Sequence, residues 1–193
     1  GNQVFFIEDP SVGFSPENND LLVNKIKLFL KKFPKLFNFI YMSFGAVFVG
    51  KSAQYAIQSI EPGGLILNLG SGIKKIRKEV VNVDFYPFEG VDVVADITEL
   101  PFVDNSVDAI VNEFVLEHLP SPEKVVGEMF RVMKSGAILY VAVPFVASFH
   151  SSPNDFYRWS RQGLRSFLKD FQEIESGIRC GPTSAFIFVL SEW

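Results

Sequence analysis

The sequence contains very little cysteine and histidine. Cys180 is the only cysteine among 193 residues, which excludes an internal disulfide and suits a reducing compartment. His118 and His150 are the only histidines, and without a pair of cysteines they are too few for a structural zinc site. We therefore expect no metal in this chain.

The chain also lacks an excess of basic charge and a long apolar run. It carries 18 Lys and Arg against 22 Asp and Glu, whereas nonspecific nucleic-acid binding needs a strongly basic surface. The longest mostly apolar stretch, residues 36–50, is shorter than the roughly twenty residues of a membrane-spanning helix, and residues 1–20 do not resemble a secretion signal. We expect a cytoplasmic protein with no nucleic-acid partner.

Apolar residues nonetheless make up 48% of the sequence, enough for the core of one domain. In residues 21–33 they recur at helical spacing among lysines, Pro34 ends that pattern, and a second helical pattern covers about 36–60. We predict that residues 1–61 form an arm and a helical extension. This extension is expected to be a lid, a homodimer contact or, through residues 21–50, a peripheral contact with a membrane surface.

From residue 62 onward, apolar strand patterns alternate with helical ones, which predicts a parallel sheet covered on both faces. Strands are predicted at 65–69, 80–84, 91–95, 107–112, 137–143 and near 171–178. Helices or helical turns are predicted at 73–79, 113–119, 122–134 and 161–169, with a long loop at 144–160. Residues 186–190 fit either a strand or an apolar helix, and the abrupt end suggests that the natural chain continues beyond Trp193.

The first predicted strand of this region ends in a glycine pair, Gly70-Ser71-Gly72. Glycine lets the backbone approach a ligand closely because it has no Cβ, although such glycines are also common in ordinary turns. The next strand ends in Asp84, a carboxylate that can accept hydrogen bonds from a ribose diol. Together these features predict a nucleoside pocket.

The glycine turn does not match the dinucleotide fingerprint G-x-G-x-x-G, because Lys75 stands at its third glycine position. The connection to the next strand is also too short for a full helix, on whose N-terminus a pyrophosphate would sit. An NAD-dependent oxidoreductase is therefore a disfavoured alternative.

Polar side chains follow two further predicted strands. Asp96 can accept from an exocyclic amine while Ile97 packs on a purine, although Asp96 also suits a simple turn cap. Asn112 and Glu113 end the strand predicted at 107–112, at the sheet edge where ligands bind in folds of this class.

Several stretches together resemble the class I S-adenosylmethionine-dependent methyltransferases, and among them the small type 11 group. They cover roughly residues 62–185 and include Asn68-Leu69-Gly70-Ser71-Gly72, Asn82-Val83-Asp84, Ala95-Asp96-Ile97, Leu100-Pro101-Phe102, Val115-Leu116-Glu117-His118-Leu119, Phe130 to Ala137 and Asp155-Phe156-Tyr157-Arg158-Trp159. The resemblance implies an α/β, doubly wound, mostly parallel Rossmann-like sheet of the seven-stranded type. Residues 62–193 would then be the S-adenosylmethionine-binding methyltransferase domain.

The resemblance also implies a role for each matching residue. Those expected to bind S-adenosyl-L-methionine, or its product S-adenosyl-L-homocysteine, are Asn68, Gly70, Ser71, Gly72, Asp84, Asp96, Ile97, Asn112 and Glu113. The family often has Asp or Glu where Asn68 stands, which would weaken a contact with the ammonium group of the cofactor.

The acceptor side is expected near the polar loops after the fourth and fifth strands. If the acceptor is a hydroxyl, the candidates for a general base are His118, His150, Asp155 and Tyr157. Arg158 and Trp159 could hold an anionic or sugar-like acceptor by ion pairing and stacking. A structural role for His118, and a core position for Trp159, are equally good interpretations.

The predicted function is methyl transfer from S-adenosylmethionine to a small-molecule, lipid or sugar-like acceptor. The alternative is a noncatalytic module of the same fold that binds S-adenosylmethionine or a partner.

Overall fold

The computed structural model describes residues 3–6, 48–150 and 154–191. Its strands are β1 (Val4–Phe5), β2 (Ile66–Leu69), β3 (Val80–Asp84), β4 (Val93–Val94), β5 (Val107–Glu113) and β6 (Met133–Ala142). Its helices are α3 (Ala53–Ala56), the 3-10 turn η2 (Leu116–His118), α4 (Pro122–Val132), α5 (Arg161–Phe167) and α6 (Pro182–Ser191).

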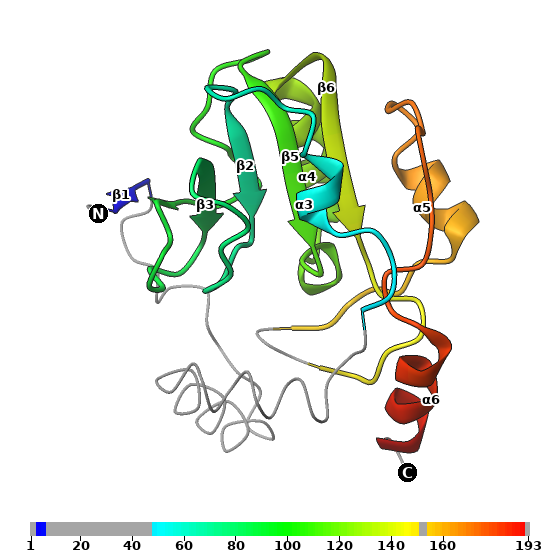
Figure 1. Ribbon diagram of the computed structural model, residues 1–193. Coiled ribbons are helices and arrows are strands. Elements are labelled where there is room, and N and C mark those ends of the chain that lie inside the picture. The colour runs from blue at the N-terminus through cyan, green and yellow to red at the C-terminus, as the bar shows by residue number, and fades with distance from the viewer. Residues whose placement is uncertain (1–2, 7–47, 151–153, 192–193) are drawn as a thin grey trace.

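The six strands form one sheet in the order β1-β4-β3-β2-β5-β6, and every neighbouring pair is parallel. The chain runs outward from β2 to β3 and β4, then returns to the other side of β2 with β5 and β6 (Figure 1). The direction of winding therefore changes between β2 and β5, and the carboxyl ends of the strands meet at one edge.

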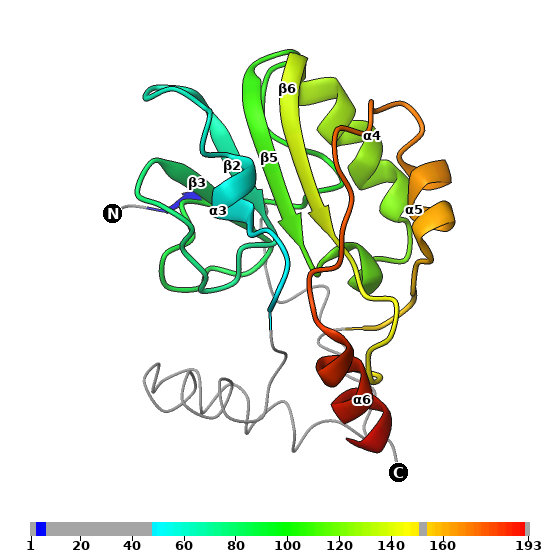
Figure 2. The same ribbon diagram turned by 45° about the vertical axis from the view of Figure 1, so that its right-hand side comes forward.

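Alternate residues of the strands bury opposite faces, as the pleat requires. Leu67 and Leu69 of β2 face the side on which Met129 and Val132 of α4 pack, whereas Ile66 belongs to the core on the α3 side. Figure 2 shows α3 and α4 on opposite sides of β5 and β6. The doubly wound parallel α/β fold is thus confirmed.

Helix α4 has clear sequence causes. Pro122 occupies its first turn, where a missing N–H costs nothing. Its buried residues follow at helical spacing and form one apolar stripe: Val125, Val126, Met129 and Val132. The helix ends at Val132, and β6 starts at the next residue.

Several predicted elements are corrected by the structure. The described residues form six strands rather than seven, and one of them, β1, was not predicted. Residues 73–79 form turns without a helix, and residues 171–178 contain no strand. The helix or helical turn predicted at 113–119 is the short turn η2. Residues 186–190 are helical within α6.

The N-terminal extension is mostly outside the described residues. The helix predicted at 21–33 lies there, as do residues 36–47 of the one predicted at 36–60. The described residues 48–60 contain only the four-residue helix α3, so a continuous helix to residue 60 is wrong. The division at residue 61 therefore stays a prediction. Within the described ranges, no helix combines the length and the apolar character that crossing a membrane requires.

Candidate functional site

The predicted cofactor residues lie around the carboxyl ends of β2, β3 and β5. The chain leaves β2 through the glycine turn, in which Gly70 has φ +69° and Gly72 has φ +55°. Residues that carry a Cβ rarely adopt this left-handed backbone conformation. A Cβ at Gly70 would also lie 2.4 Å from Cγ2 of Val115, so the turn passes directly against the chain that follows β5.

The glycine turn is tied to the end of β3. The N–H groups of Gly70 and Ser71 both donate to the carbonyl of Val83, and Gly72 N donates to Oδ2 of Asp84 at 2.7 Å. The other oxygen of Asp84 accepts from Tyr86 N at 3.0 Å. Asp84 is 8% exposed, and these amide contacts fix the orientation of its carboxylate beside the turn.

Asn68 is used inside the sheet. Its amide donates to Oδ1 of Asn82 at 3.0 Å, its register partner on β3, and to the carbonyl of Lys74 at 3.3 Å. It is 4% exposed, so the side chain joins two strands and the following turn beneath the edge of the sheet.

Asp96 caps its own turn, as one of the two sequence interpretations proposed. Its Oδ1 accepts from the backbone N–H of Thr98 at 2.8 Å and from the hydroxyl of Thr98 at 2.7 Å. Ile97 is buried in the core on the α4 side. The two residues follow β4, next to the end of β3.

Asn112 and Glu113 end β5 with different environments. Asn112 is fully buried, its amide donates to the carbonyl of Leu69 at 3.3 Å, and its Oδ1 has no hydrogen-bond partner in the described part of the chain. Glu113 pairs with Lys74 and, at 2.8 Å, with Nε of Arg179. Burial raises the pKa of Glu113, but the hydrogen bonds from these two cations outweigh it, and the pKa lies below its ordinary value.

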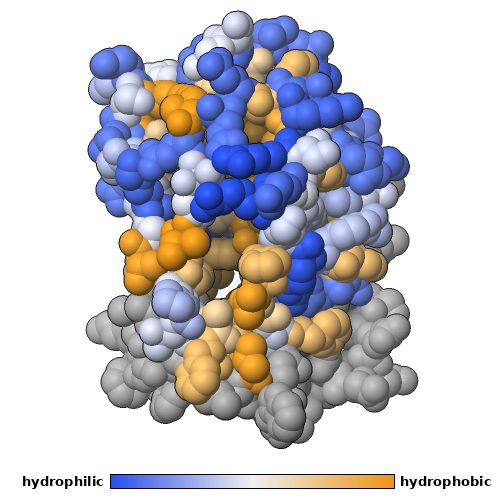
Figure 3. Space-filling view, turned by 90° about the vertical axis from the view of Figure 1, so that its right-hand side faces the viewer, coloured by the Kyte–Doolittle hydropathy of each residue, from blue (hydrophilic) through white to orange (hydrophobic). Residues whose placement is uncertain are grey.

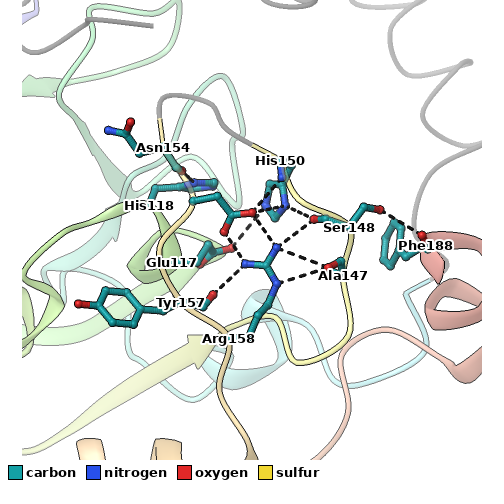
Figure 4. A network of polar contacts seen from close by, with 10 residues as sticks. Glu117, His118, Ala147, Ser148, His150, Asn154, Tyr157, Arg158 and Phe188 are labelled. Atoms are coloured by element: carbon teal, nitrogen blue, oxygen red, sulfur yellow. Dashed lines mark hydrogen bonds and ion pairs between the residues drawn. The ribbon is translucent and has the colours of Figure 1, made fainter. Parts of the chain in front are cut away.

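The predicted acceptor residues of the 144–160 loop largely hold the loop itself. Arg158 forms a two-pronged pair with Asp155 and donates to the carbonyl of Ser148 at 3.0 Å (Figure 4). The hydroxyl of Tyr157 donates to the carbonyl of Pro120 at 3.1 Å. Burial raises the pKa of Asp155, but hydrogen bonds from Arg158 and from the His150 N–H bring it below its ordinary value.

Trp159 packs against the core and stacks near two aromatic rings, with centroids 5.4 Å from Tyr157 and 6.1 Å from Phe167. The backbone N–H of Trp159 donates to the carbonyl of Pro144. This is the core position weighed from the sequence.

The two histidines are brought together although 32 positions separate them in the numbering. Their rings meet edge to face with centroids 5.1 Å apart. Nδ1 of His118 contacts the carbonyl of Asn154, and Nδ1 of His150 lies 2.9 Å from the carbonyl of Ser148. Burial lowers the pKa of His118.

Glu117 completes this group and was not predicted as a site residue. It is fully buried, and its Oε1 lies 3.9 Å from Nε2 of His150. Burial raises its pKa to about 7. The sequence did hold a signal: an acidic residue stands between Leu116 and Leu119, in a turn where both leucines pack into the core.

A hollow of about 270 Å³ lies at the opposite edge of the sheet, near the start of β2 and β6, where Lys134 pairs with Asp108 at 2.8 Å. Ligands in open α/β sheets bind at the carboxyl ends of the strands. We therefore assign the hollow no role.

Comparison with known proteins agrees with the methyltransferase family that the sequence resembles. Residues 70–141 match the family described as "Methyltransferase domain". Over 91 residues the chain is 35% identical to a demethylmenaquinone methyltransferase of Renibacterium salmoninarum and 33% identical to one of Paenarthrobacter aurescens. Each match covers 47% of this chain but only 35% and 33% of the respective relatives, so the chain spans about a third of their length in these matches.

Among solved structures, the PH0226 protein of Pyrococcus horikoshii OT3 aligns with a TM-score of 0.51. The alignment covers 65% of this chain and 81% of that protein at 16% identity, and it supports the fold alone. The named relatives are methyltransferases, so the matches do not favour the noncatalytic alternative.

Proposed function

We propose that this chain, a member of the class I S-adenosylmethionine-dependent methyltransferases in the type 11 group, transfers a methyl group to a small-molecule, lipid or sugar-like acceptor. The observation that carries the proposal is the placement of Asp84. Its carboxylate ends β3 and is held by the N–H of Gly72, in the turn that leaves β2. The strand order reverses between β2 and β5, so this turn borders the usual ligand site of such sheets.

The residues at this edge suit the cofactor's polar groups. Asp84 supplies acceptors for the ribose diol, and the unpartnered Oδ1 of Asn112 supplies a buried acceptor for the ammonium group. A Cβ built on Gly72 meets no atom within 4 Å, so the backbone there borders open space. We assign Asp96 and Ile97 to the adenine side, where the Thr98 contacts orient the Asp96 carboxylate.

The other residues assigned to the cofactor site support it rather than supply polar groups to the cofactor. Gly70 and Ser71 shape the turn, and Asn68 supports it from below through Lys74 and Asn82. Glu113 holds Lys74 and Arg179 at the end of β5. These residues act mainly by fixing the position of the site.

When bound, S-adenosylmethionine supplies a methyl group on a positively charged sulfur, which is already strongly electrophilic. The protein therefore has to align an acceptor and exclude water rather than provide a covalent nucleophile. In this proposal Asp155, Tyr157, Arg158 and Trp159 shape the loop at the acceptor side, since their polar groups are used to hold residues 144–160. His118 and His150 are the side chains placed to handle an acceptor proton.

The acceptor class is supported by two observations. The demethylmenaquinone methyltransferases among the relatives suggest a small molecule. Phe145 and Phe149, which are 68% and 66% exposed on the loop after β6, suit an acceptor with an apolar part.

The proposal is tested by calorimetric titration with S-adenosylhomocysteine. Asp84→Asn keeps the shape of the side chain but removes the charge, so affinity should fall about tenfold or more, since a hydrogen bond to a charged group is worth about 1.5–3 kcal/mol. Glu89→Gln is the matched control, because Glu89 is an exposed acid on the same β3–β4 connection and should bind normally. Equal affinity of wild type and Asp84→Asn would remove Asp84 from the site.

A further inference from the structure

Three side chains that could bind a metal ion converge beside the loop after β6. Glu117 and His118 come from η2, and His150 comes from the loop (Figure 4). One potential ligand atom of each residue lies within 4.8 Å of those of the other two.

Among the described residues, the carboxylate of Glu117 has no hydrogen-bond partner. The residue is 0% exposed, and neither Oε1 nor Oε2 has a hydrogen bond within the described ranges. The 3.9 Å from Oε1 to Nε2 of His150 is too long for a hydrogen bond. A buried, unpaired carboxylate costs several kcal/mol, so the position calls for a proton or a cation.

In both imidazole rings the nitrogen Nδ1 is turned to a backbone carbonyl. Nδ1 of His118 and Nδ1 of His150 each face a backbone carbonyl, which places the ring proton on Nδ1. The lone pair is then on Nε2 in both rings. A histidine that binds a metal commonly donates its other N–H to a carbonyl in this way.

The charges near Glu117 are engaged with each other. Arg158 acts on Glu117 through its charge, but its two terminal nitrogens pair with the carboxylate of Asp155. The charges of Asp155 and Arg158 offset each other, so an ionised Glu117 beside two neutral histidines gives the group one negative charge.

We propose that Glu117, His118 and His150 form a binding site for a divalent transition-metal ion. Two nitrogens and one carboxylate oxygen are a ligand set that zinc accepts, and with bonds of about 2.0–2.1 Å, ligands on one tetrahedral ion lie about 3.3 Å apart. The 3.9 Å between Glu117 and His150 reaches that value by small side-chain rotations. This site goes beyond the proposed function and revises two earlier assignments. A bound ion takes the Nε2 lone pairs of His118 and His150, which then do not act as general bases. The expectation of no metal considered the two histidines without Glu117.

Three protein ligands leave the ion one further coordination position, for water or for an oxygen of the acceptor. Binding of the acceptor there rests on the proposed function, whereas binding of the ion does not.

The test uses the purified full chain after treatment with a chelator, without S-adenosylmethionine. Titration with Co²⁺ should give the visible bands of a tetrahedral site at one ion per chain, and Zn²⁺ should displace it. Glu117→Gln and His150→Asn should each weaken Zn²⁺ affinity on the order of a hundredfold or more, since loss of even an outer-shell partner costs about 10–100-fold. Glu123→Gln, an exposed acid on α4, is the control and should bind as the wild type does.

Thermal melting separates loss of the site from loss of the fold. In chelator, Glu117→Gln should melt at the wild-type temperature or above, because it removes an unpaired buried charge. Zn²⁺ should raise the melting temperature of the wild type and of Glu123→Gln only. If Glu117→Gln does not fold, the Zn²⁺ affinity of His150→Asn tests the site in its place. Absence of stoichiometric binding in the wild type, or unchanged affinity in His150→Asn, overturns the site whether or not S-adenosylhomocysteine binds.

Discussion

At the scale of single residues, the site depends on positions where a residue packs closely against a residue far away in the sequence. The glycine pair was recognised from the sequence because glycine after an apolar run favours a close backbone approach. The sequence did not reveal that Val115 is the group approached, since that contact joins residues 45 positions apart. Glu117 was missed for a related reason: an acid is normally expected at the surface, and only packing shows that this one is buried.

Gly70→Ala should destabilise the protein by about 2 kcal/mol or more. The new Cβ would lie 2.4 Å from Val115, and alanine at positive φ is strained by roughly 1–2 kcal/mol. Urea unfolding measures the loss. The additional change Val115→Ala should recover the steric part and leave the backbone strain.

Gly127→Ala is the matched control for this substitution. Gly127 lies in α4, and a Cβ there meets nothing within 4 Å, so alanine should stabilise the protein by about 0.5–1 kcal/mol. If Gly70→Ala were as stable as Gly127→Ala, the inference that the glycine turn packs closely against Val115 would be wrong.

At the scale of elements, the strands β2, β3 and β5 were predictable because apolar residues predominate in them, as is typical of buried parallel strands. The two-residue strand β1 was not, because its pairing with β4 depends on a contact almost ninety positions away. A strand was predicted near 171–178, where Phe171, Ile174 and Ile178 are the apolar residues, yet no strand of the described part of the sheet pairs with this segment. A pattern alone does not supply a hydrogen-bonding partner.

Arg158 supplies several of the contacts that hold the described part of the loop after β6. Arg158→Lys keeps the charge but loses the planar fork that contacts Asp155 and the Ser148 carbonyl. Amide exchange of His150 and Trp159, which donate to Asp155 and Pro144, should accelerate about tenfold or more, given about 1.5–3 kcal/mol for hydrogen bonds to charged groups. Hydrogen exchange measured by NMR reports each amide.

Arg165→Lys supplies the comparison, because Arg165 also makes a two-pronged pair, with Glu173, but on an exposed surface. It should leave the exchange of His150 and Trp159 unchanged. Equal exchange rates in Arg158→Lys and wild type would show that other contacts hold the loop.

At the scale of the whole molecule, the face in Figure 3 is mostly hydrophilic in its upper part and carries more exposed apolar residues in its lower part. Exposed apolar residues gather on the side where α6 and the loop after β6 lie, and they include Phe145, Phe149, Phe186 and Val189 (Figure 3). The predicted membrane-surface or dimer contact was placed on residues 21–50, most of which lie outside the described residues, so that part of the sequence interpretation stays a prediction. The apolar content of 48% does not indicate where apolar side chains stay exposed, because that depends on how the chain folds.

Distant parts of the chain meet at Glu113, which joins the end of β5 to Lys74 after the glycine turn and to Arg179 before α6. Its folded-state pKa is lowered, so its contribution to stability is complete above the unfolded pKa of about 4.3 and is lost as the pH falls through the folded value. Glu113→Gln should therefore lower the free energy of unfolding by about 1–3 kcal/mol at neutral pH. The difference from wild type should shrink below about pH 4.

Urea unfolding of both proteins across this pH range isolates Glu113, because every other titrating group is shared. Glu175→Gln is the control: Glu175 pairs with Lys51, but both side chains are about half exposed, so the effect should stay within about 0–1 kcal/mol. Glu113 and Glu175 are both paired but only the side chain of Glu113 is buried, so their comparison shows how burial changes the contribution of an ion pair to stability. A difference between wild type and Glu113→Gln that is the same at pH 7 and in acid would mean that packing at the end of β5, and not the charge of Glu113, connects the glycine turn to the C-terminal segment.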